Sequence, residues 1–269
     1  MCERFTTSKI EKFNDLRKVA SFGFRGEALA SVSYVSRLTV ISKTEGQDLA
    51  YTAIFQNGEM VRTAGENPKG CAAQKGTTLQ VRDLFFNSKQ RKKSIGANEE
   101  YAKIVDVVAR YSVHYPLIKF TCKKVEDKRT DVTTHAVPRP KCLTDPESED
   151  EDISQEKLMD KMNEVRSDIL RRHYGHNIVG KEAFCCFKYW DVLQMGVNLY
   201  LTKPNTVTAK KNLFLLFVNN RLVESDKLKR VIDSTYSMYQ PKGGYSYLVY
   251  MALSVKPELI DVNVHPTKK

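Results

Sequence analysis

The chain has 269 residues, which is enough for one large domain or two of ordinary size with buried cores. Its composition, 41% hydrophobic and 28% charged, is that of a globular protein, and no apolar run is long enough to cross a bilayer, which excludes a membrane span. The first residues lack an apolar signal core and the six cysteines show no C-x-x-C spacing, so the sequence indicates a reducing compartment.

The formal net charge of +11 indicates what kind of partner the chain could bind. Basic residues recur along the whole chain, at positions 89–93, 123–124, 128–129, 171–172, 210–211 and 227–230. A distributed positive surface attracts phosphate backbones through counterion release, whatever the base sequence. This favours nucleic acid as a partner over the alternative, a solvated lysine-rich surface. The run at 89–93 is also a weaker candidate for a nuclear import signal.

The first elements in chain order are a short helix at 27–32 and strands at 37–42 and 49–55. An Asn57-Gly58 turn should join the second strand to a partner that begins near Met60. A further strand follows at 77–81. Asn98 is expected to cap a helix whose apolar face packs against the sheet and consists of Tyr101, Ile104, Val105, Val108 and Tyr111.

A segment at 138–152 combines three prolines with an acidic run, so it should be a linker or surface insertion. It divides the chain into residues 1–137, an acidic linker or insertion at 138–160, and residues 161–269. Mixed helices and strands on both sides predict two α+β domains.

After the linker, an apolar stripe from Leu158 to Ile169 predicts a helix that ends at Gly175. Strands at 214–218 and 221–223 should form a hairpin through an Asn219-Asn220 turn. A helix with its apolar face between Leu228 and Tyr239 and a strand at 245–255 complete the pattern.

Cys185 and Cys186 are neighbours, and His173 and His176 precede them closely. A zinc site can be drawn from these residues, but adjacent cysteines suit one tetrahedral ion poorly. We therefore expect two buried thiols on a strand.

Three short motifs could carry chemistry. Gly23 and Gly26 precede a helix whose free amides could face a phosphate, although such glycine pairs also merely end loops. Gly76 opens a strand with Thr77 behind it, which suits a ligand contact but more often marks a glycine turn. Lys268 follows Pro266 and is either a positioned point charge for phosphate or a solvated side chain.

Together these motifs resemble, in order and approximate spacing, the amino-terminal half of the MutL family of mismatch repair proteins. The resemblance rests on residues 6–9, 23–29, 76–77, 217–221 and 261–268 and covers nearly the whole chain. The flanking residues 2–5 and the ending His265-Pro266-Thr267-Lys268 resemble the eukaryotic MLH-type subunit rather than its PMS-type partner.

The resemblance implies an α+β fold in which a partial GHKL-type ATPase sandwich precedes a transducer domain like domain 2 of ribosomal protein S5. It implies ATP and Mg²⁺ as cofactors of the full-length protein. The positions that match nucleotide-binding motifs are Thr7, Ser8, Lys9, Gly23, Arg25, Gly26, Glu27, Ala28, Leu29, Gly76 and Thr77. Lys268 matches a catalytic lysine that reaches the γ-phosphate, and Arg221 matches a basic position on a DNA-facing surface.

The expected partners are double-stranded DNA, a PMS-type MutL homologue and a MutS-type mismatch recognition complex, in the nucleus. The general-base glutamate, the Mg²⁺-binding asparagine and the D-x-G-x-G loop of the family would all precede the first residue of this chain, and neither Glu3 nor Glu27 occupies the matching position. Whether the chain hydrolyses ATP is therefore left open by its sequence. One alternative is a non-catalytic DNA-binding fragment or isoform. Another is the ATPase-transducer region of a type II topoisomerase, which the ending at 265–268 disfavours.

Overall fold

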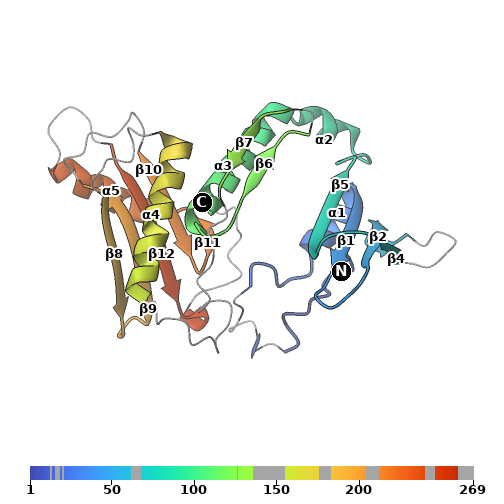
Figure 1. Ribbon diagram of the computed structural model, residues 1–269, viewed down its shortest axis with the longest axis horizontal. Helices are drawn as coiled ribbons and strands as arrows, with labels where there is room; N and C mark the ends of the chain where they lie inside the picture. The colour runs from blue at the N-terminus through green and yellow to red at the C-terminus, as the bar shows by residue number, and fades with distance from the viewer. Residues whose placement is uncertain are drawn as a thin grey trace. The chain divides into compact units, whose positions relative to one another are not determined.

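The computed structural model describes residues 1–12, 14–15, 19, 21–61, 68–125, 127–135, 155–175, 183–203, 212–239 and 246–259. It divides into two compact units, Met1–Glu100 and Tyr101–Lys269 (Figure 1). None of the helices in these ranges combines the length and apolar character needed to span a membrane.

Unit 1 contains a five-stranded sheet in the order β3-β2-β1-β5, with β4 also paired to β2. All its strand pairs are antiparallel. The strands are β1 Arg37–Lys43, β2 Ala50–Gln56, β3 Glu59–Met60, β4 Lys69–Cys71 and β5 Gly76–Arg82. The helices are α1 Ala28–Val35 and α2 Lys89–Ser94. These elements confirm the helix and strands predicted for this region, with bounds that shift by up to three residues.

Helix α1 covers part of one face of this sheet. Leu38 and Val40 alternate along β1 and are buried against Leu29 and Val32 of α1, and the fully buried Cys2 joins the same cluster. On neighbouring β5, Leu79 pairs opposite Val40, so its side chain lies on the same face, yet it is 46% exposed. The core of unit 1 is therefore small, because α1 shields β1 and leaves β5 open.

The predicted turn between β2 and β3 is present and is docked on α1. Asn57 and Gly58 both have positive φ, 53° and 82°, as a two-residue hairpin turn of right-handed strands requires. The Gly58 amide donates to Ser33 Oγ at 3.0 Å, and the Asn57 amide donates to the Ser33 carbonyl at 3.0 Å. The turn thereby fixes β2 and β3 relative to the helix.

Unit 2 is built on a five-stranded sheet in the order β11-β10-β12-β9-β8. Strand β10 is parallel to β12, and the other pairs are antiparallel. The strands are β8 Ala183–Trp190, β9 Met195–Thr202, β10 Leu213–Val218, β11 Arg221–Val223 and β12 Leu248–Val255, with β6 Thr121–Lys123 and β7 Thr130–Thr133 paired separately. The helices are α3 Ala97–His114, which begins in unit 1, α4 Gln155–Tyr174 and α5 Asp226–Tyr239, and the short 3-10 helix η3 is Pro257–Leu259.

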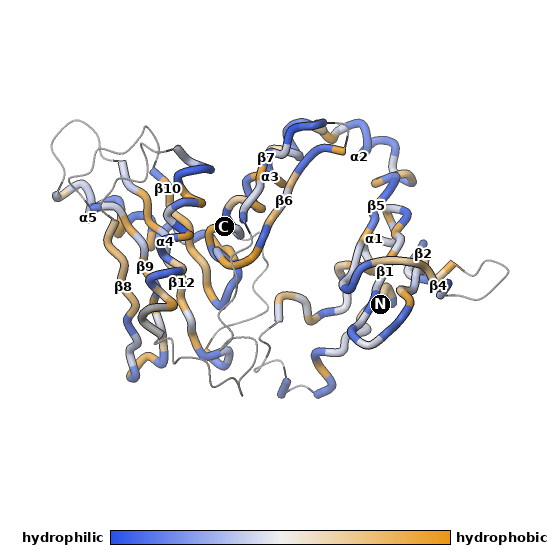
Figure 2. Tube along the Cα trace, in the orientation of Figure 1, coloured by the Kyte–Doolittle hydropathy of each residue, from blue (hydrophilic) through white to orange (hydrophobic). Residues whose placement is uncertain are grey.

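Helices cover both faces of the five-stranded sheet of unit 2. On one face, Val113 of α3 and Leu170 of α4 pack with Tyr200, Leu215 and Leu248 of the strands. Figure 1 shows α4 lying across β9 and β12. On the other face, α5 packs through Tyr236. In Figure 2, β10 and β12 are largely hydrophobic in colour, whereas α2 is hydrophilic, as expected for buried central strands and an exposed helix.

The elements predicted for the second half are also confirmed. Gly175 follows α4 with φ 93°, a C-terminal conformation that glycine adopts most easily. The turn between β10 and β11 consists of Asn219 and Asn220, with φ 45° and 66°. The predicted helix over Leu228–Tyr239 corresponds to α5.

Two predictions are wrong in detail. Helix α3 begins at Ala97 and the Gly96 carbonyl accepts from the Glu100 amide, so Asn98 lies inside the first turn rather than at the cap. Cys185 and Cys186 lie on strand β8 as expected, but Cys185 is exposed and Cys186 is only half-buried. The reason is that, among the described strands, β8 pairs only with β9 and so lies at the edge of the sheet, where fewer neighbouring side chains cover it.

Several predictions fall outside the described residues. They concern His176, Lys268, the proline-rich segment at 138–152 and the ending at 261–268. The domain limits at 137 and 160 stay a prediction beside the division into units at Glu100 and Tyr101.

Candidate functional sites

The structure brings the two predicted nucleotide-binding segments, residues 6–9 and 23–29, into direct contact. The Phe5 amide donates to the Gly26 carbonyl at 3.2 Å. Gly26 has φ 63°, and a Cβ at this position would lie 2.3 Å from the Thr6 carbonyl oxygen. The backbones therefore touch, and only glycine fits. We call these two segments together the glycine-loop site.

The amino terminus of α1 lies within this site. Glu27 precedes the helix with φ −106° and ψ −30°, and its side chain makes no capping hydrogen bond. The first turn, which begins with Ala28 and Leu29, contains no acidic residue. The first amides of a helix have no intrahelical acceptor, and the helix dipole places partial positive charge there. The site is thus suited to an anionic group.

Side chains around the loop add positive charge and hydroxyl groups. Lys9 and Arg25 are exposed, and the Arg25 guanidinium lies 5.4 Å from the ring centroid of the buried Phe24. The Lys9 amide donates to Thr7 Oγ1 at 3.1 Å, which fixes the turn that carries Ser8. Two cations and two hydroxyl side chains therefore belong to the segments around the helix terminus.

Gly76 and Thr77 begin β5, as predicted, and pair with Lys43 and Ser42 at the end of β1. Thr77 Oγ1 lies 3.1 Å from Ser42 Oγ. Only Ser36 separates α1 from β1 and the two elements pack together, so the chain reverses and the end of β1 lies on the side where α1 begins. Gly76 and Thr77 are therefore at the same end of unit 1 as the glycine-loop site.

An open hollow of unit 1 does not coincide with this site. It lies between the first three residues and the hairpin of β2 and β3, and none of the predicted nucleotide-binding residues lines it. The helix terminus is better suited to phosphate than this hollow is, because phosphate recognition relies on directed amides and positive charge rather than on concavity.

The β10–β11 hairpin of unit 2 presents Arg221 directly after its turn. Arg221 is half-buried and opens β11. The Asn219 side chain holds the turn against β12, because Asn219 Nδ2 donates to the Val255 carbonyl at 2.7 Å and Asn219 Oδ1 accepts from the Val255 amide at 2.8 Å. Exposed cations follow on α5 at Lys227, Lys229 and Arg230.

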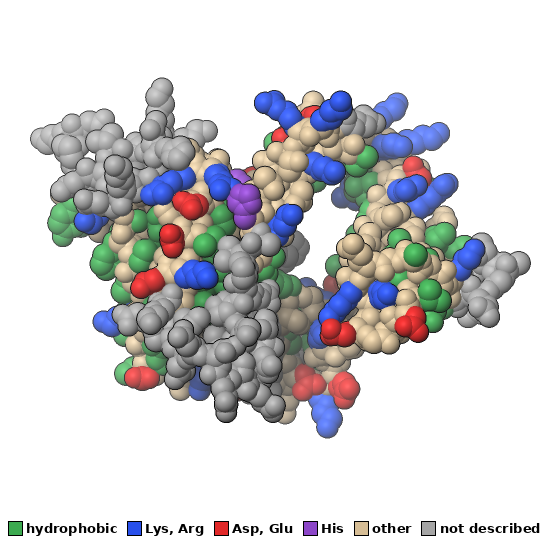
Figure 3. Space-filling view, viewed as in Figure 1, with side chains coloured by type: hydrophobic (Ala, Val, Ile, Leu, Met, Phe, Trp, Pro, Cys, Tyr) green, Lys and Arg blue, Asp and Glu red, His purple; other side chains and the backbone are tan. Residues whose placement is uncertain are grey.

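The basic run at 89–93 is exposed on α2 in unit 1. Figure 3 shows Lys and Arg side chains gathered around this helix. The Arg91 guanidinium lies 5.0 Å from the ring centroid of Phe85, a cation–π contact that orients it.

A buried polar network lies beneath the hairpin. The site residues predicted from the sequence do not include any of its members. His114, at the end of α3, stacks flat on Phe217, with ring centroids 4.0 Å apart and an interplanar angle of 9°. One ring nitrogen, Nδ1, lies 2.9 Å from Tyr250 Oη, and the other, Nε2, lies 3.0 Å from Asn220 Oδ1. Burial lowers the pKa of His114 to about 4, opposed by the hydrogen bond to Asn220, so the imidazole is neutral at neutral pH.

Arg166 of α4 completes this network and is 1% exposed. Its Nε donates to the Val113 carbonyl at 3.1 Å, its guanidinium also donates to Asn163, and its Cζ lies 4.4 Å from the ring centroid of Tyr250. A sequence signal exists in retrospect, because Arg166 lies three and four residues before Ile169 and Leu170, on the apolar face of the helix.

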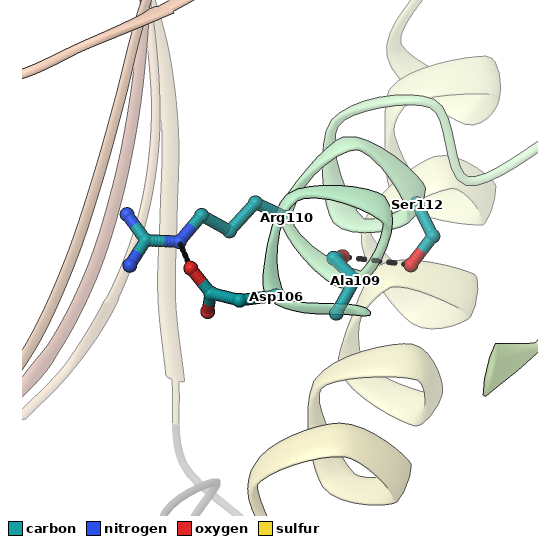
Figure 4. A network of polar contacts seen from close by, with 4 residues as sticks. All are labelled: Asp106, Ala109, Arg110 and Ser112. Atoms are coloured by element: carbon teal, nitrogen blue, oxygen red, sulfur yellow. Dashed lines mark hydrogen bonds and ion pairs between the residues drawn. The ribbon is translucent and has the colours of Figure 1, made fainter. Parts of the chain in front are cut away.

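Three further contacts stabilise α3 and its packing on α4. Figure 4 shows Asp106 and Arg110 paired on α3, with Asp106 Oδ2 2.7 Å from Arg110 Nε. Ser112 Oγ donates to the Ala109 carbonyl at 2.8 Å and lies 3.1 Å from His173 Nε2 of α4. These contacts hold the helix that carries His114.

Comparisons with known proteins agree with these features. A family model described as DNA mismatch repair protein, C-terminal domain, matches residues 171–269. The whole chain is 36% identical to the DNA mismatch repair protein MLH1 of Saccharomyces cerevisiae, of which it covers 31%. The chain spans about a third of the length of the curated relatives it matches.

Two solved structures resemble the fold. One is the Aquifex aeolicus MutL ATPase domain complexed with ADP, with a TM-score of 0.56, 16% identity, and coverage of 92% of this chain and 76% of that one. The other is the N-terminal domain of a DNA repair protein, with a TM-score of 0.65, 22% identity, and coverage of 93% and 69%. The fold is therefore α+β and of the GHKL ATPase type, as predicted. The chain belongs to the MutL/MLH family of DNA mismatch repair proteins.

Proposed function

We propose that this chain is the nucleotide-binding and DNA-binding part of a MutL-type mismatch repair factor, and that its glycine-loop site binds the phosphates of ATP. The observation that carries the nucleotide part is the contact of Thr6 with Gly26 at the uncapped start of α1. The ADP complex of the structurally similar Aquifex aeolicus domain supports the same assignment.

The residues present fit a triphosphate. The first amides of α1 would donate to phosphate oxygens, while Lys9 and Arg25 would neutralise part of the charge. Thr7 and Ser8 would supply hydroxyl donors from the neighbouring segment. Gly26 allows that segment to approach the helix closely enough for both to reach one ligand.

Mg²⁺ that binds together with a nucleotide takes most of its ligands from phosphate and water oxygens, with one or two side chains. No group of three or more His, Cys, Asp or Glu side chains within the described ranges could hold a metal ion. The role we propose for the described residues is to bind and orient the phosphates.

Equilibrium binding of ATP and of adenosine tests the nucleotide proposal. The chain should bind ATP and bind adenosine far more weakly, since the phosphates provide most of the affinity. Arg25→Ala should weaken ATP binding roughly tenfold, the usual effect of removing one charge-assisted hydrogen bond. Arg37→Ala is the matched control, because Arg37 begins β1 at the other end of the strand and pairs with Asp83 at 3.6 Å. Equal affinity for ATP and adenosine would rule out a phosphate site.

We further propose that the β10–β11 hairpin contacts double-stranded DNA through Arg221, with the exposed cations of α5 beside it. A net charge of +11 supports association with a polyanion. Arg221 is half-buried, which supports a defined contact, because a partly immobilised side chain loses less entropy on binding.

Binding of a short duplex at several salt concentrations tests this face. Log affinity should fall with log salt by roughly 0.9 per neutralised phosphate, and Arg221→Glu should reduce both affinity and slope. Arg129→Glu makes the same charge change on the separate β6–β7 ribbon and should have the smaller effect. Equal losses in the two variants would point to net charge alone and remove the hairpin from the interface.

Family membership also supports the remaining expectations, namely a PMS-type partner, a MutS-type recognition complex and a nuclear location. They belong to the proposal for the whole protein. Co-purification of this chain with a PMS-type homologue would test the first of them.

A further inference from the structure

The buried polar network of unit 2 forms a continuous chain of hydrogen bonds that ends at the turn before Arg221. The hydrogen bonds run from Tyr250 through His114 to Asn220, and Arg166 lies over the ring of Tyr250; we call these four residues the hairpin relay. Arg166, Tyr250 and His114 are buried, and each comes from a different element, α4, β12 and α3. The three residues are thus positioned by the core, whereas Asn220 belongs to the turn.

The chemistry of the groups fixes the direction of every hydrogen bond. Asn220 Oδ1 can only accept, so His114 Nε2 must carry the proton. In a neutral imidazole, Nδ1 is then the acceptor, and the Tyr250 hydroxyl donates to it. The Arg166 guanidinium lies over the face of the Tyr250 ring, 4.4 Å from its centroid, and holds that ring in place. Both bonds point from Tyr250 toward the turn, an arrangement in which each bond strengthens the next.

The turn itself needs support, because Asn219 and Asn220 both have positive φ. That conformation is costly for residues with a Cβ and persists where side-chain contacts hold it. Asn219 is held by the Val255 backbone and Asn220 by His114. The two asparagines therefore fasten the turn to β12 and to α3, and Arg221 is the next residue along the chain.

We propose that Arg166, Tyr250 and His114 are positioning residues for the nucleic-acid contact of the hairpin, which act by holding Asn220 and thereby setting the direction in which Arg221 leaves the turn. This rests on the proposed DNA contact of Arg221. The ligand class is the phosphate backbone of duplex DNA, and none of the three positioning residues needs to touch it.

Two substitutions each remove a hydrogen bond of the relay with little change in the shape of the protein. Tyr250→Phe removes one buried hydroxyl and keeps the ring under Arg166. Asn220→Gly removes the amide, and glycine adopts the positive φ of the turn without strain. Tyr247→Phe is the matched control, because Tyr247 is also fully buried and its hydroxyl donates to Asp233 Oδ1 at 2.8 Å on the side of the sheet covered by α5.

Duplex binding and amide hydrogen exchange of the whole chain provide the readouts, at a temperature where each variant is folded. Tyr250→Phe and Asn220→Gly should each weaken DNA binding roughly fivefold, as expected when one hydrogen bond is removed. The double variant should bind no more weakly than Asn220→Gly alone, since both changes cut the same chain. Amides at 219–223 should exchange faster in both variants, while those of β8 and β9 should not change.

The other possible results show whether the positioning role or the DNA contact of Arg221 is wrong. If Arg221→Ala weakens binding while Tyr250→Phe binds DNA as well as Tyr247→Phe does, the positioning role is wrong and the DNA face remains. Additive losses in the double variant would likewise overturn the relay. If Arg221→Ala leaves DNA binding unchanged, the DNA face is wrong, and the positioning role is overturned with it.

Discussion

Replacing Gly26 with alanine is the sharpest perturbation of the glycine-loop site. Gly26 has φ 63°, and a Cβ there would lie 2.3 Å from the Thr6 carbonyl oxygen and 2.7 Å from the Thr6 nitrogen. The three nearest atoms all belong to the Thr6 backbone, so no side-chain rotation relieves the overlap. Since ordinary contact begins at 3.4 Å, the Thr6 segment must move away by about 1 Å.

The expected cost has two parts. The left-handed conformation costs an alanine roughly 1 kcal/mol wherever it occurs. The displacement adds an effect specific to this site, because a hydrogen bond lengthened by about 1 Å is no longer one. The 6–9 segment should then fail to make at least one charge-assisted hydrogen bond to phosphate, so ATP affinity should fall roughly tenfold or more.

Gly46→Ala is the control that separates the displacement of the Thr6 segment from the cost of positive φ. Gly46 also has positive φ, 80°, but no atom lies within 4 Å of its Cβ position. The positive φ should destabilise both alanine variants by a similar amount, measured by urea unfolding. Only Gly26→Ala should also lose ATP affinity, measured by titration. If both variants bind ATP like the parent chain, the contact of Thr6 with Gly26 has no part in nucleotide binding.

Three further predictions concern stability and turnover. Leu38→Ala should destabilise unit 1 by roughly 2–5 kcal/mol, whereas Leu79→Ala should cost less than about 1 kcal/mol, because Leu38 is fully buried and Leu79 is 46% exposed; equal shifts in urea midpoint would contradict this. Since burial lowers the pKa of His114 from 6.5 to about 4, the unfolded chain takes up this proton first, so stability is intact above pH 6.5 and falls by up to about 3 kcal/mol toward pH 4. A His114→Gln variant should lack this part of the pH dependence in urea unfolding, and an unchanged profile would count against the buried neutral imidazole. Purified alone, the chain should show no Mg²⁺-dependent release of phosphate from ATP above background, and a turnover abolished by Glu27→Gln would mean that the catalytic acid was misassigned.

Local signals in the sequence predicted most elements because local physics determines them. The Asn57-Gly58 and Asn219-Asn220 turns follow from residues that tolerate positive φ between runs of apolar residues. Gly175 ends α4 for the same reason. The error at Asn98 arose because Gly96 lies two residues earlier and its carbonyl accepts the first helical hydrogen bond.

Burial and long-range contacts could not be predicted from local sequence signals. The exposure of Cys185 depends on β8 being an edge strand, which only the strand order reveals. The relay joins His114 to Tyr250 across 136 positions of sequence, and no periodicity connects residues so far apart. For the glycine-loop site, the residue types were predictable, but the contact of Thr6 with Gly26 required the structure.

The most direct test of the nucleotide site is a titration of the ¹⁵N-labelled chain with ATP, followed by backbone amide chemical shifts. Our account predicts that the largest changes fall on the amides of residues 6–9 and 26–29, with smaller changes at Gly76 and Thr77. Changes confined to the hollow between the first three residues and the β2–β3 hairpin, with the amides at the start of α1 unmoved, would contradict it.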